Sequence, residues 1–180
     1  MAEFAEAIQK TLLLEGGYVN DPLDAGGETY RGISRKNFPN WEGWEILDKH
    51  KLDELFPHSL DWDTKLQALV ISFYRANFWH YDAIKAQAVA DKIFDLAVNV
   101  GERHAISIVQ TALNALLEGI TLIHVDGMWG SKTLTAVNST PNGSLLPAIK
   151  KGAIWYHNLI VKAHPEDAKF LNGWIARDNS

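Results

Sequence analysis

The chain has 180 residues, of which 47% are hydrophobic and 22% charged, the balance of a globular protein that can bury a real core. It contains no Cys, which excludes disulfides, thiolate metal sites and a Cys nucleophile. The net charge is −5, and residues 1–100 carry 10 basic against 16 acidic side chains. Because phosphate binding needs clustered basic residues, we expect no nucleic-acid partner.

The first predicted element is a helix over residues 3–14, with Phe4, Ile8 and Leu12 on one face. Its start has acidic residues where a signal peptide needs Lys or Arg, and its apolar run is three Leu long. No stretch of the sequence has the apolar length that spans a bilayer. We therefore expect synthesis in the cytoplasm without a signal peptide, and no stable membrane insertion.

Residues 15–33 follow as a Gly- and Asp-rich loop with room for a short irregular hairpin, and residues 34–57 resemble short helical turns. Apolar residues at helical spacing predict the later helices, which lie in residues 65–80, 88–101, 105–119, 132–138 and 144–163. Strand-like alternation never runs longer than a few residues. The sequence therefore predicts a mainly α fold, a helical bundle with a short hairpin or loop.

Glu15 and the loop after it form the candidate catalytic segment. Glu15 falls in the last turn of the first helix, where the negative end of the helix dipole and the preceding leucines favour a neutral carboxyl. Asp24 and Thr29 lie on the Gly-rich return and come within reach of Glu15 if the loop folds back. A protonated acid beside a second acidic or hydroxyl group is typical of glycoside hydrolysis. The spacing alone leaves a purely structural loop open, whereas the ligand order of an EF-hand calcium loop is absent.

Weaker candidates lie further along the chain. Tyr74, Trp79 and Tyr81 in "FYRANFWHYD" could stack on sugar rings, although aromatic residues at this spacing more often form a core. Asn99 could present its amide to substrate or cap its own helix. Trp129 in "VDGMWGSKT" could contact glycan from an exposed position, while the Asp-Gly pair before it favours a turn.

Metal and serine chemistry find no support in the sequence. The seven His residues are scattered, without the HExxH pattern of a zinc-binding helix. No Gly-x-Ser-x-Gly elbow marks a serine hydrolase. We therefore predict a protein that needs no metal and no cofactor.

The segment "EGGYVNDPLDAGGETYRGIS" resembles the N-terminal signature of glycoside hydrolase family 108, the lysozyme-like N-acetylmuramidases of phages and bacteria. The stretches "FYRANFWHYD", "IFDLAVNVG", "VQTALNALL" and "FLNGWIARDN" agree with it, and "VDGMWGSKTLTAV" resembles the DG-x-x-G-x-x-T element of its peptidoglycan-binding segment. The resemblance implies one lysozyme-like α+β domain over residues 1–180. Residues 1–95 would be its catalytic part, with residues 96–180 a peptidoglycan-binding helical part packed onto it.

The same resemblance implies that Glu15 is the catalytic acid and that Asp24 and Thr29 act beside it, with Asp21 competing for the role of Asp24. It also implies that Tyr30 lines the same groove. The expected protein is a monomeric phage endolysin that cleaves the β-1,4 bond between N-acetylmuramic acid and N-acetylglucosamine. It would reach peptidoglycan glycan strands in the periplasm or cell wall after release. A lytic transglycosylase and a wall-binding or secretion-accessory module without turnover remain the alternatives.

Overall fold

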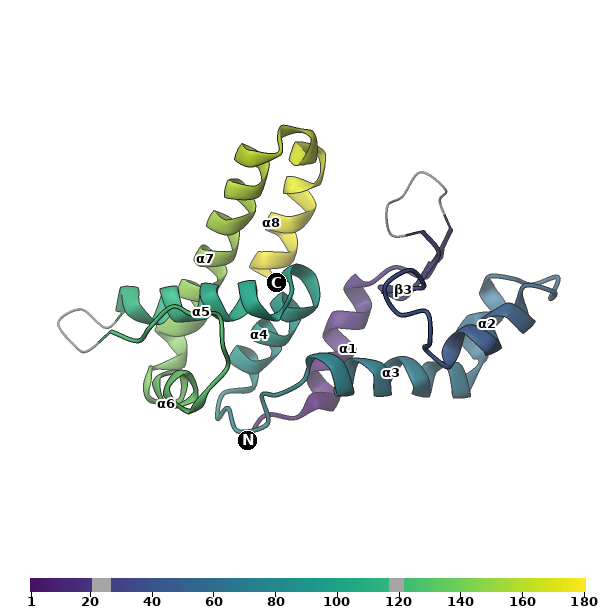
Figure 1. Cartoon of the computed structure of the whole chain (residues 1–180). Coiled ribbons are helices and arrows are strands. Elements are labelled where there is room, and N and C mark those ends of the chain that lie inside the picture. The colour runs from purple at the N-terminus through teal and green to yellow at the C-terminus, as the bar shows by residue number, and fades with distance from the viewer. Residues whose placement is uncertain (21–26, 117–121) are drawn as a thin grey trace. The chain divides into compact units, whose positions relative to one another are not determined.

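The computed structural model of the protein describes residues 1–20, 27–116 and 122–180. These residues form two compact units. We call residues 8–77 the hairpin unit, and residues 1–7 together with 78–180 the helical unit. Helices dominate both units, and the strands among the described residues belong to one small sheet (Figure 1).

The hairpin unit combines helices with a three-stranded antiparallel sheet (Figure 1). Its helices are α1 (Phe4–Leu14, which begins in the helical unit), α2 (Gly43–His50), the 3-10 helix η1 (His58–Trp62) and α3 (Thr64–Phe78). Its strands, each two residues long, pair in chain order as β1 (Tyr18–Val19), β2 (Thr29–Tyr30) and β3 (Ile33–Ser34). The register sets Tyr30 opposite both Tyr18 and Ile33, so β2 is the central strand.

Side chains from the sheet and from the helices share the core of the hairpin unit. Those no more than 1% exposed include Tyr30, Ile33, Leu47, Leu60, Leu66 and Val70. The start of α3 is capped by Asp63, whose Oδ1 accepts a hydrogen bond from the Leu66 backbone N–H at 2.8 Å. The other carboxylate oxygen lies 2.9 Å from Nε2 of His50, the last residue of α2. Polar contacts therefore fix where α3 begins, and apolar burial holds it in place.

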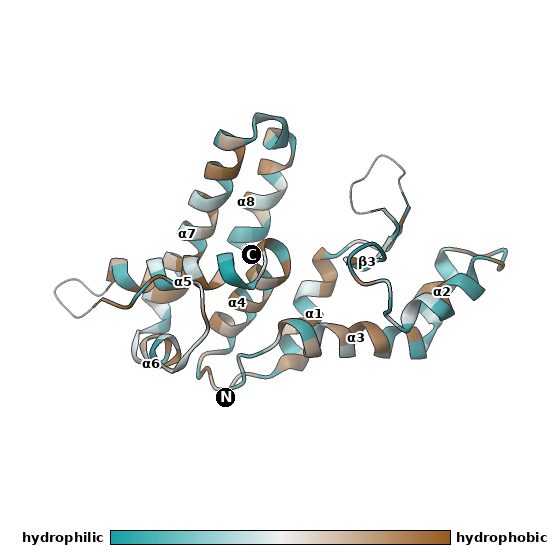
Figure 2. Ribbon diagram, in the orientation of Figure 1, coloured by the Kyte–Doolittle hydropathy of each residue, from teal (hydrophilic) through white to brown (hydrophobic). Residues whose placement is uncertain are grey.

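Among its described residues, the helical unit consists of helices joined by loops (Figure 1). Its elements after the first turn of α1 are α4 (Gln87–Val100), α5 (Glu102–Leu116), α6 (Ser131–Ser139), α7 (Asn142–Ala163), η2 (Pro165–Phe170) and α8 (Leu171–Asn179). Residues 91–97 of α4 are buried in succession, because α5 and α7 both pack against this helix. Apolar residues recur along α4 and α7 (Figure 2), as the packing of buried helices requires.

The turn before α6 is held by one buried side chain, Gln110 of α5. Its Oε1 accepts hydrogen bonds from the backbone N–H groups of Asp126 at 3.0 Å and Gly127 at 2.9 Å. Its Nε2 donates to Asp126 Oδ1 at 2.8 Å and to Thr133 Oγ1 at 3.2 Å. Gly127 has φ +70°, and a Cβ there would lie 2.6 Å from a backbone oxygen. The Asp-Gly pair is therefore a structural turn.

The predicted mainly α fold with a short hairpin is confirmed. The helix expected over residues 105–119 begins earlier, at Glu102, and residues 117–119 lie outside the described part of the chain. The closing α8 was not among the predicted elements, because "LNGWIARDN" is short and its apolar spacing is weak. Among the described helices, none combines the length and apolar character that crossing a membrane requires.

Candidate active site

Glu15 follows α1 directly and extends its last turn. Its backbone N–H donates to the Thr11 carbonyl oxygen at 3.2 Å, and the residue is half-buried. Gly16 and Gly17 come next, and the chain then enters β1. The end of a helix and the start of a hairpin therefore meet at this carboxylate.

The turn between β2 and β3 lies against the Glu15 carboxylate. A Cβ atom at Gly32 would lie 2.6 Å from Glu15 Oε2 and 2.6 Å from the Tyr74 hydroxyl oxygen. Gly32 has φ +76°, and Arg31 before it has φ +43°, so both residues adopt the left-handed region that favours glycine. The turn is tied back to the entry of β1, because Arg31 N–H donates to Gly17 O at 3.1 Å. One carboxylate oxygen and one phenol oxygen thus share the space that a side chain at position 32 would fill.

Tyr74 of α3 supports this turn from the core. Its side chain is 2% exposed, and its hydroxyl donates to the Arg31 carbonyl oxygen at 2.7 Å. The predicted site residues Glu15 and Tyr74 are therefore brought together. The structure gives Tyr74 a definite task in holding the turn, and its predicted contact with substrate stays a prediction.

The other predicted residues of the hairpin differ in exposure. Thr29 is half-buried, and its Oγ1 donates to the Gly27 carbonyl oxygen at 3.2 Å. Tyr30 is 1% exposed, and its hydroxyl accepts a hydrogen bond from Gln67 Nε2 at 2.8 Å. Its place in the wall of the groove, which the resemblance implied, stays a prediction. Asp21 and Asp24 lie outside the described residues.

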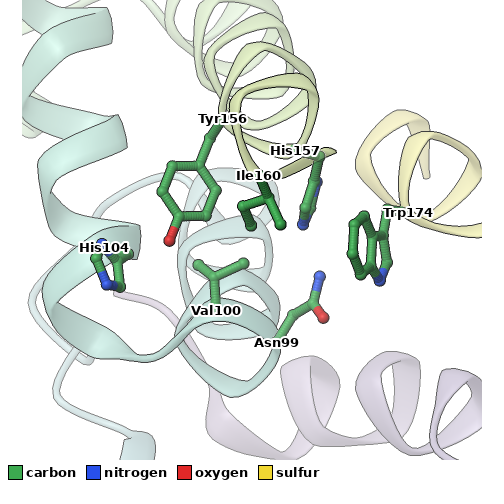
Figure 3. A pocket seen from close by; sticks show the side chains of 7 residues that line it. All are labelled: Asn99, Val100, His104, Tyr156, His157, Ile160 and Trp174. Carbon is green, nitrogen blue, oxygen red and sulfur yellow. The ribbon is translucent and has the colours of Figure 1, made fainter. Parts of the chain in front are cut away.

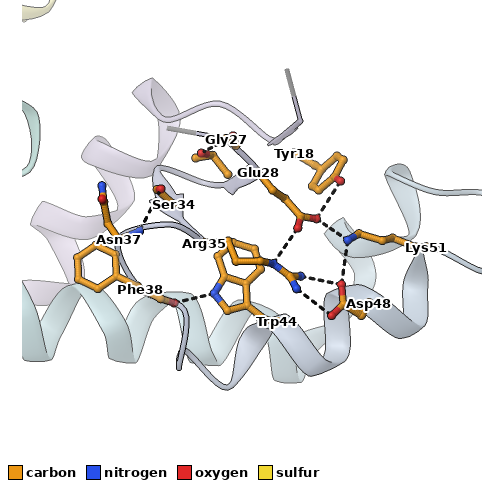
Figure 4. Close-up of polar contacts among 11 residues, drawn as sticks. Tyr18, Gly27, Glu28, Ser34, Arg35, Asn37, Phe38, Trp44, Asp48 and Lys51 are labelled. Carbon is orange, nitrogen blue, oxygen red and sulfur yellow. Dashed lines mark hydrogen bonds and ion pairs between the residues drawn. The ribbon is translucent and has the colours of Figure 1, made fainter. Parts of the chain in front are cut away.

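A cluster of charged side chains fixes the return strand, and sequence reasoning missed it. Glu28, which precedes β2, lies 2.7 Å from Arg35 Nε and 2.6 Å from Lys51 Nζ, and accepts a hydrogen bond from the Tyr18 hydroxyl at 2.9 Å (Figure 4). Arg35 also bonds to both carboxylate oxygens of Asp48, at 3.0 and 2.6 Å. The guanidinium of Arg35, with help from Lys51, lowers the pKa of Asp48 to about 2. We call these five residues the Glu28 cluster; they come from β1, from the residues next to β2 and β3, and from the end of α2, so no sequence motif indicates the cluster.

The remaining predicted site residues belong to the helical unit. Asn99 lies in the last turn of α4, and its Nδ2 is buried without a hydrogen-bond partner, so that nitrogen does not cap the helix. Trp129 is half-buried, and its ring meets Tyr81 edge-on with centroids 5.2 Å apart. Contact of either residue with substrate stays a prediction.

Comparisons with known proteins agree with the motifs. Residues 8–101 match the family model described as Glycosyl hydrolase 108, and residues 104–179 match the model described as Predicted Peptidoglycan domain. No curated protein matches the chain. Among solved structures, the one titled "Structure of Brucella abortus SagA" is 27% identical in sequence with a TM-score of 0.65, and the alignment covers 98% of this chain and 89% of that chain. The resemblance stated from the sequence is thereby confirmed.

Proposed function

Because the chain belongs to the glycosyl hydrolase 108 family and is a peptidoglycan hydrolase, we propose that it is an N-acetylmuramidase. The bond cut is the β-1,4 link from N-acetylmuramic acid to N-acetylglucosamine, and Glu15 is the general acid. The observation that supports this most directly is the place of Glu15. Its half-buried carboxylate lies at a helix end against the left-handed turn at Gly32.

The proposed reaction moves one proton and one water molecule. Protonated Glu15 donates its proton to the bridging oxygen as the bond from that oxygen to the anomeric carbon breaks. Asp24 and Thr29 stabilise the positive charge that develops at the anomeric carbon, or orient the water that attacks it. Water supplies the new hydroxyl group, and its remaining proton restores the carboxyl of Glu15 or is taken up by Asp24.

The first test replaces Glu15 with Gln, which keeps the shape of the side chain but cannot donate an acidic proton. Loss of a general acid lowers the rate by about 10²–10⁴-fold, measured as clearing of a purified peptidoglycan suspension. Glu42→Gln is the matched control, because Glu42 is exposed at the start of α2 in the same unit, and it should clear at the wild-type rate. If Glu15→Gln cleared the suspension at the wild-type rate, the assignment of Glu15 as the general acid would be wrong.

Asp21 and Asp24 compete for the role of second acidic group, and paired variants separate them. We expect Asp24→Asn to lose most activity and Asp21→Asn to keep it, since only the carboxylate nearest the anomeric carbon stabilises the transition state. The reverse result would assign the role of second acidic group to Asp21, and the assignment of Glu15 as the general acid would not change.

Product analysis distinguishes the proposed bond from its alternatives. A muramidase leaves N-acetylmuramic acid at the new reducing end, which borohydride reduces and mass spectrometry identifies. A lytic transglycosylase leaves an anhydro sugar that is lighter by one water and resists reduction. A wall-binding or secretion-accessory module retains peptidoglycan without releasing fragments. Only the first outcome agrees with the proposal.

We further propose that the protein acts as a phage endolysin and is a monomer in solution. What supports the role in lysis is the likeness of its motifs to those of phage muramidases. Co-expression in bacteria with a pore-forming membrane protein should cause rapid lysis with the wild-type chain and not with Glu15→Gln. Failure of the wild-type chain to cause lysis in this experiment would contradict the role as an endolysin.

A further inference from the structure

The helical unit contains a cavity of about 310 Å³. It lies among the end of α4, the start of α5, and α7 and α8 (Figure 3). Its lining residues are Asn99, Val100, His104, Tyr156, His157, Ile160 and Trp174. The volume is at the lower end of the roughly 300–1,000 Å³ that small-molecule sites occupy. The cavity therefore suits a ligand of about one sugar ring.

One wall of this cavity holds an unsatisfied hydrogen-bond donor. Nδ2 of Asn99 is buried and has no hydrogen-bond partner, although burying a polar nitrogen without a hydrogen bond is unfavourable. The amide nitrogen points toward the space that His157 and Trp174 also border (Figure 3). A ligand carbonyl oxygen placed there would satisfy it.

A hydrogen-bond acceptor lies beside this donor. Nδ1 of His157 is 2.7 Å from Oδ2 of Asp178, and both residues are almost fully buried. When Nδ1 donates to this carboxylate, Nε2 is the nitrogen that carries the lone pair of the neutral ring. The ring nitrogen at the free end of His157 faces the Asn99 amide (Figure 3). Asp178 is thus a positioning residue that sets which nitrogen of His157 can accept.

The third feature is a flat aromatic wall. Trp174 stacks on His157 with ring centroids 5.0 Å apart and an interplanar angle of 23°. Tyr156 meets the other side of the cavity, where its ring lies 5.3 Å from that of His104. Flat apolar faces of this kind accommodate the C–H faces of pyranose rings.

We propose that this cavity binds an N-acetylated amino sugar through its acetamido group. A trans secondary amide presents its carbonyl oxygen and its N–H on opposite edges of one plane, which complements a donor and an acceptor that face each other. The acetyl oxygen accepts from Asn99 Nδ2, the acetamido N–H donates to His157 Nε2, and the pyranose ring rests on Trp174. That the sugar comes from peptidoglycan rests on the proposed function; the recognition of the acetamido group does not.

The test titrates the full chain with monosaccharides and follows the Trp174 indole N–H by NMR. N-acetylglucosamine and N-acetylmuramic acid should shift this signal at millimolar concentration. Glucosamine, which lacks the acetyl group, should bind at least tenfold more weakly. N-acetylalanine methylamide carries peptide amides without a sugar ring and should also bind more weakly. Equal binding of glucosamine would overturn recognition of the amide, and tighter binding of the peptide amide would overturn the choice of a sugar.

Matched variants test the residues. Asn99→Asp replaces the donor by a carboxylate that repels a carbonyl oxygen, and Trp174→Ala removes the flat wall, so each should weaken binding of N-acetylglucosamine by at least tenfold. Asn158→Asp and Trp155→Ala alter exposed residues of α7 that do not line the cavity, and should bind as the wild type does. Circular dichroism checks that each variant is folded. Wild-type affinity in folded Asn99→Asp would overturn the proposal.

The outcome is independent of the cleavage proposal. A monosaccharide has no glycosidic bond to cut, so its binding says nothing about Glu15. Conversely, Glu15→Gln should bind N-acetylglucosamine in this cavity with unchanged affinity. If Glu15→Gln lost activity and no monosaccharide bound to the wild type, the assignment of Glu15 would still hold. Only the proposed sugar binding in the cavity would be disproved.

Discussion

The two units use charged side chains in opposite ways. In the hairpin unit, the Glu28 cluster lies near the surface, where the side chains of Arg35 and Asp48 remain 31% and 47% exposed. In the helical unit, the ion pair of Arg177 with Asp95 is 15% and 9% exposed. Lys92, 4% exposed, lies 3.6 Å from the same carboxylate, and burial lowers its pKa. Arg35 and Lys51, at 31% and 33%, can therefore exchange protein partners for water more easily than Lys92 can, whereas the Glu28 carboxylate, at 12%, is as buried as Arg177.

This difference indicates which interactions restrict each unit to one packing arrangement. Buried charges in the helical unit must all be paired, so its helices can pack in few ways without leaving a charge uncompensated. In each ion pair of the Glu28 cluster, by contrast, at least one side chain is 31% or more exposed. The turn of the hairpin unit is fixed instead by left-handed backbone at Arg31 and Gly32 and by the hydroxyl of Tyr74.

The largest expected effect comes from removing a buried guanidinium. Arg177→Met leaves Asp95 buried with Lys92 as its remaining ionic partner. Breaking such a pair lowers the free energy of unfolding by about 3 kcal/mol, measured by urea denaturation. Arg35→Met removes a guanidinium of similar connectivity in the hairpin unit, and we expect about 1 kcal/mol because water replaces its contacts. Equal losses in the two variants would show that burial does not distinguish the clusters.

The next effect concerns the turn beside Glu15. Gly32→Ala places a methyl group 2.6 Å from Glu15 Oε2 and from the Tyr74 hydroxyl, so the carboxylate must move. We expect a loss of about 2 kcal/mol from the strained φ and the contact, together with at least tenfold lower peptidoglycan hydrolysis. Gly27→Ala is the control, because Gly27 also has positive φ but its added Cβ would lie within 4 Å of no other atom in the part of the chain that the structure describes. It should lose about 1 kcal/mol and keep activity within twofold, and an equal loss of activity would show that strain alone is responsible.

A smaller effect is expected when the hydroxyl of Tyr74 is removed. Tyr74→Phe leaves the Arg31 carbonyl oxygen without this hydrogen bond, which lowers the free energy of unfolding by about 1 kcal/mol. If the hydroxyl only holds the turn, the KM for peptidoglycan fragments stays unchanged and kcat falls modestly. A rise in KM with constant kcat would instead favour the substrate contact predicted from the sequence.

Sequence reasoning succeeded where one local pattern determines the structure. The apolar spacing of "AVADKIFDLAVNVG" predicts α4, which ends before Gly101, whose φ of +81° lies in the range that favours glycine. The Gly-rich loop likewise indicates a hairpin after Glu15, and the structure contains one. Periodicity and turn residues carry this information within a dozen positions, so no tertiary knowledge is needed.

Sequence reasoning was insufficient where contacts between segments far apart in the chain determine the structure. The Glu28 cluster joins a strand, a loop and α2, and charge alone does not reveal which basic residue meets which carboxylate. The sequence likewise does not show that Tyr30 is 1% exposed, or that its hydroxyl accepts a hydrogen bond from Gln67 of α3. For Asn99 the sequence left two uses open, and only the packing of α4 shows that its Nδ2 has no partner. Each case depends on tertiary contacts that no short motif encodes.

The smallest expected effect is an acid dependence at the junction of α2 and α3. The hydrogen bond from His50 and the backbone N–H of Leu66 lower the pKa of Asp63 from its ordinary value of 3.8. A carboxyl with a depressed folded pKa stabilises the native state above its ordinary pKa, and this contribution is lost as the pH falls through the folded value. Because Asp63 is 23% exposed, the contribution should be below about 1 kcal/mol.

Asn also caps helices well, so Asp63→Asn should unfold slightly more easily than the wild type at pH 6 and equally easily near pH 2, as measured by thermal denaturation at both values. If wild type and Asp63→Asn differed in thermal stability by the same amount at both pH values, the ionised carboxylate would add nothing beyond the helix cap. The His50–Asp63 pair would then exchange with water as readily as the ion pairs of the Glu28 cluster.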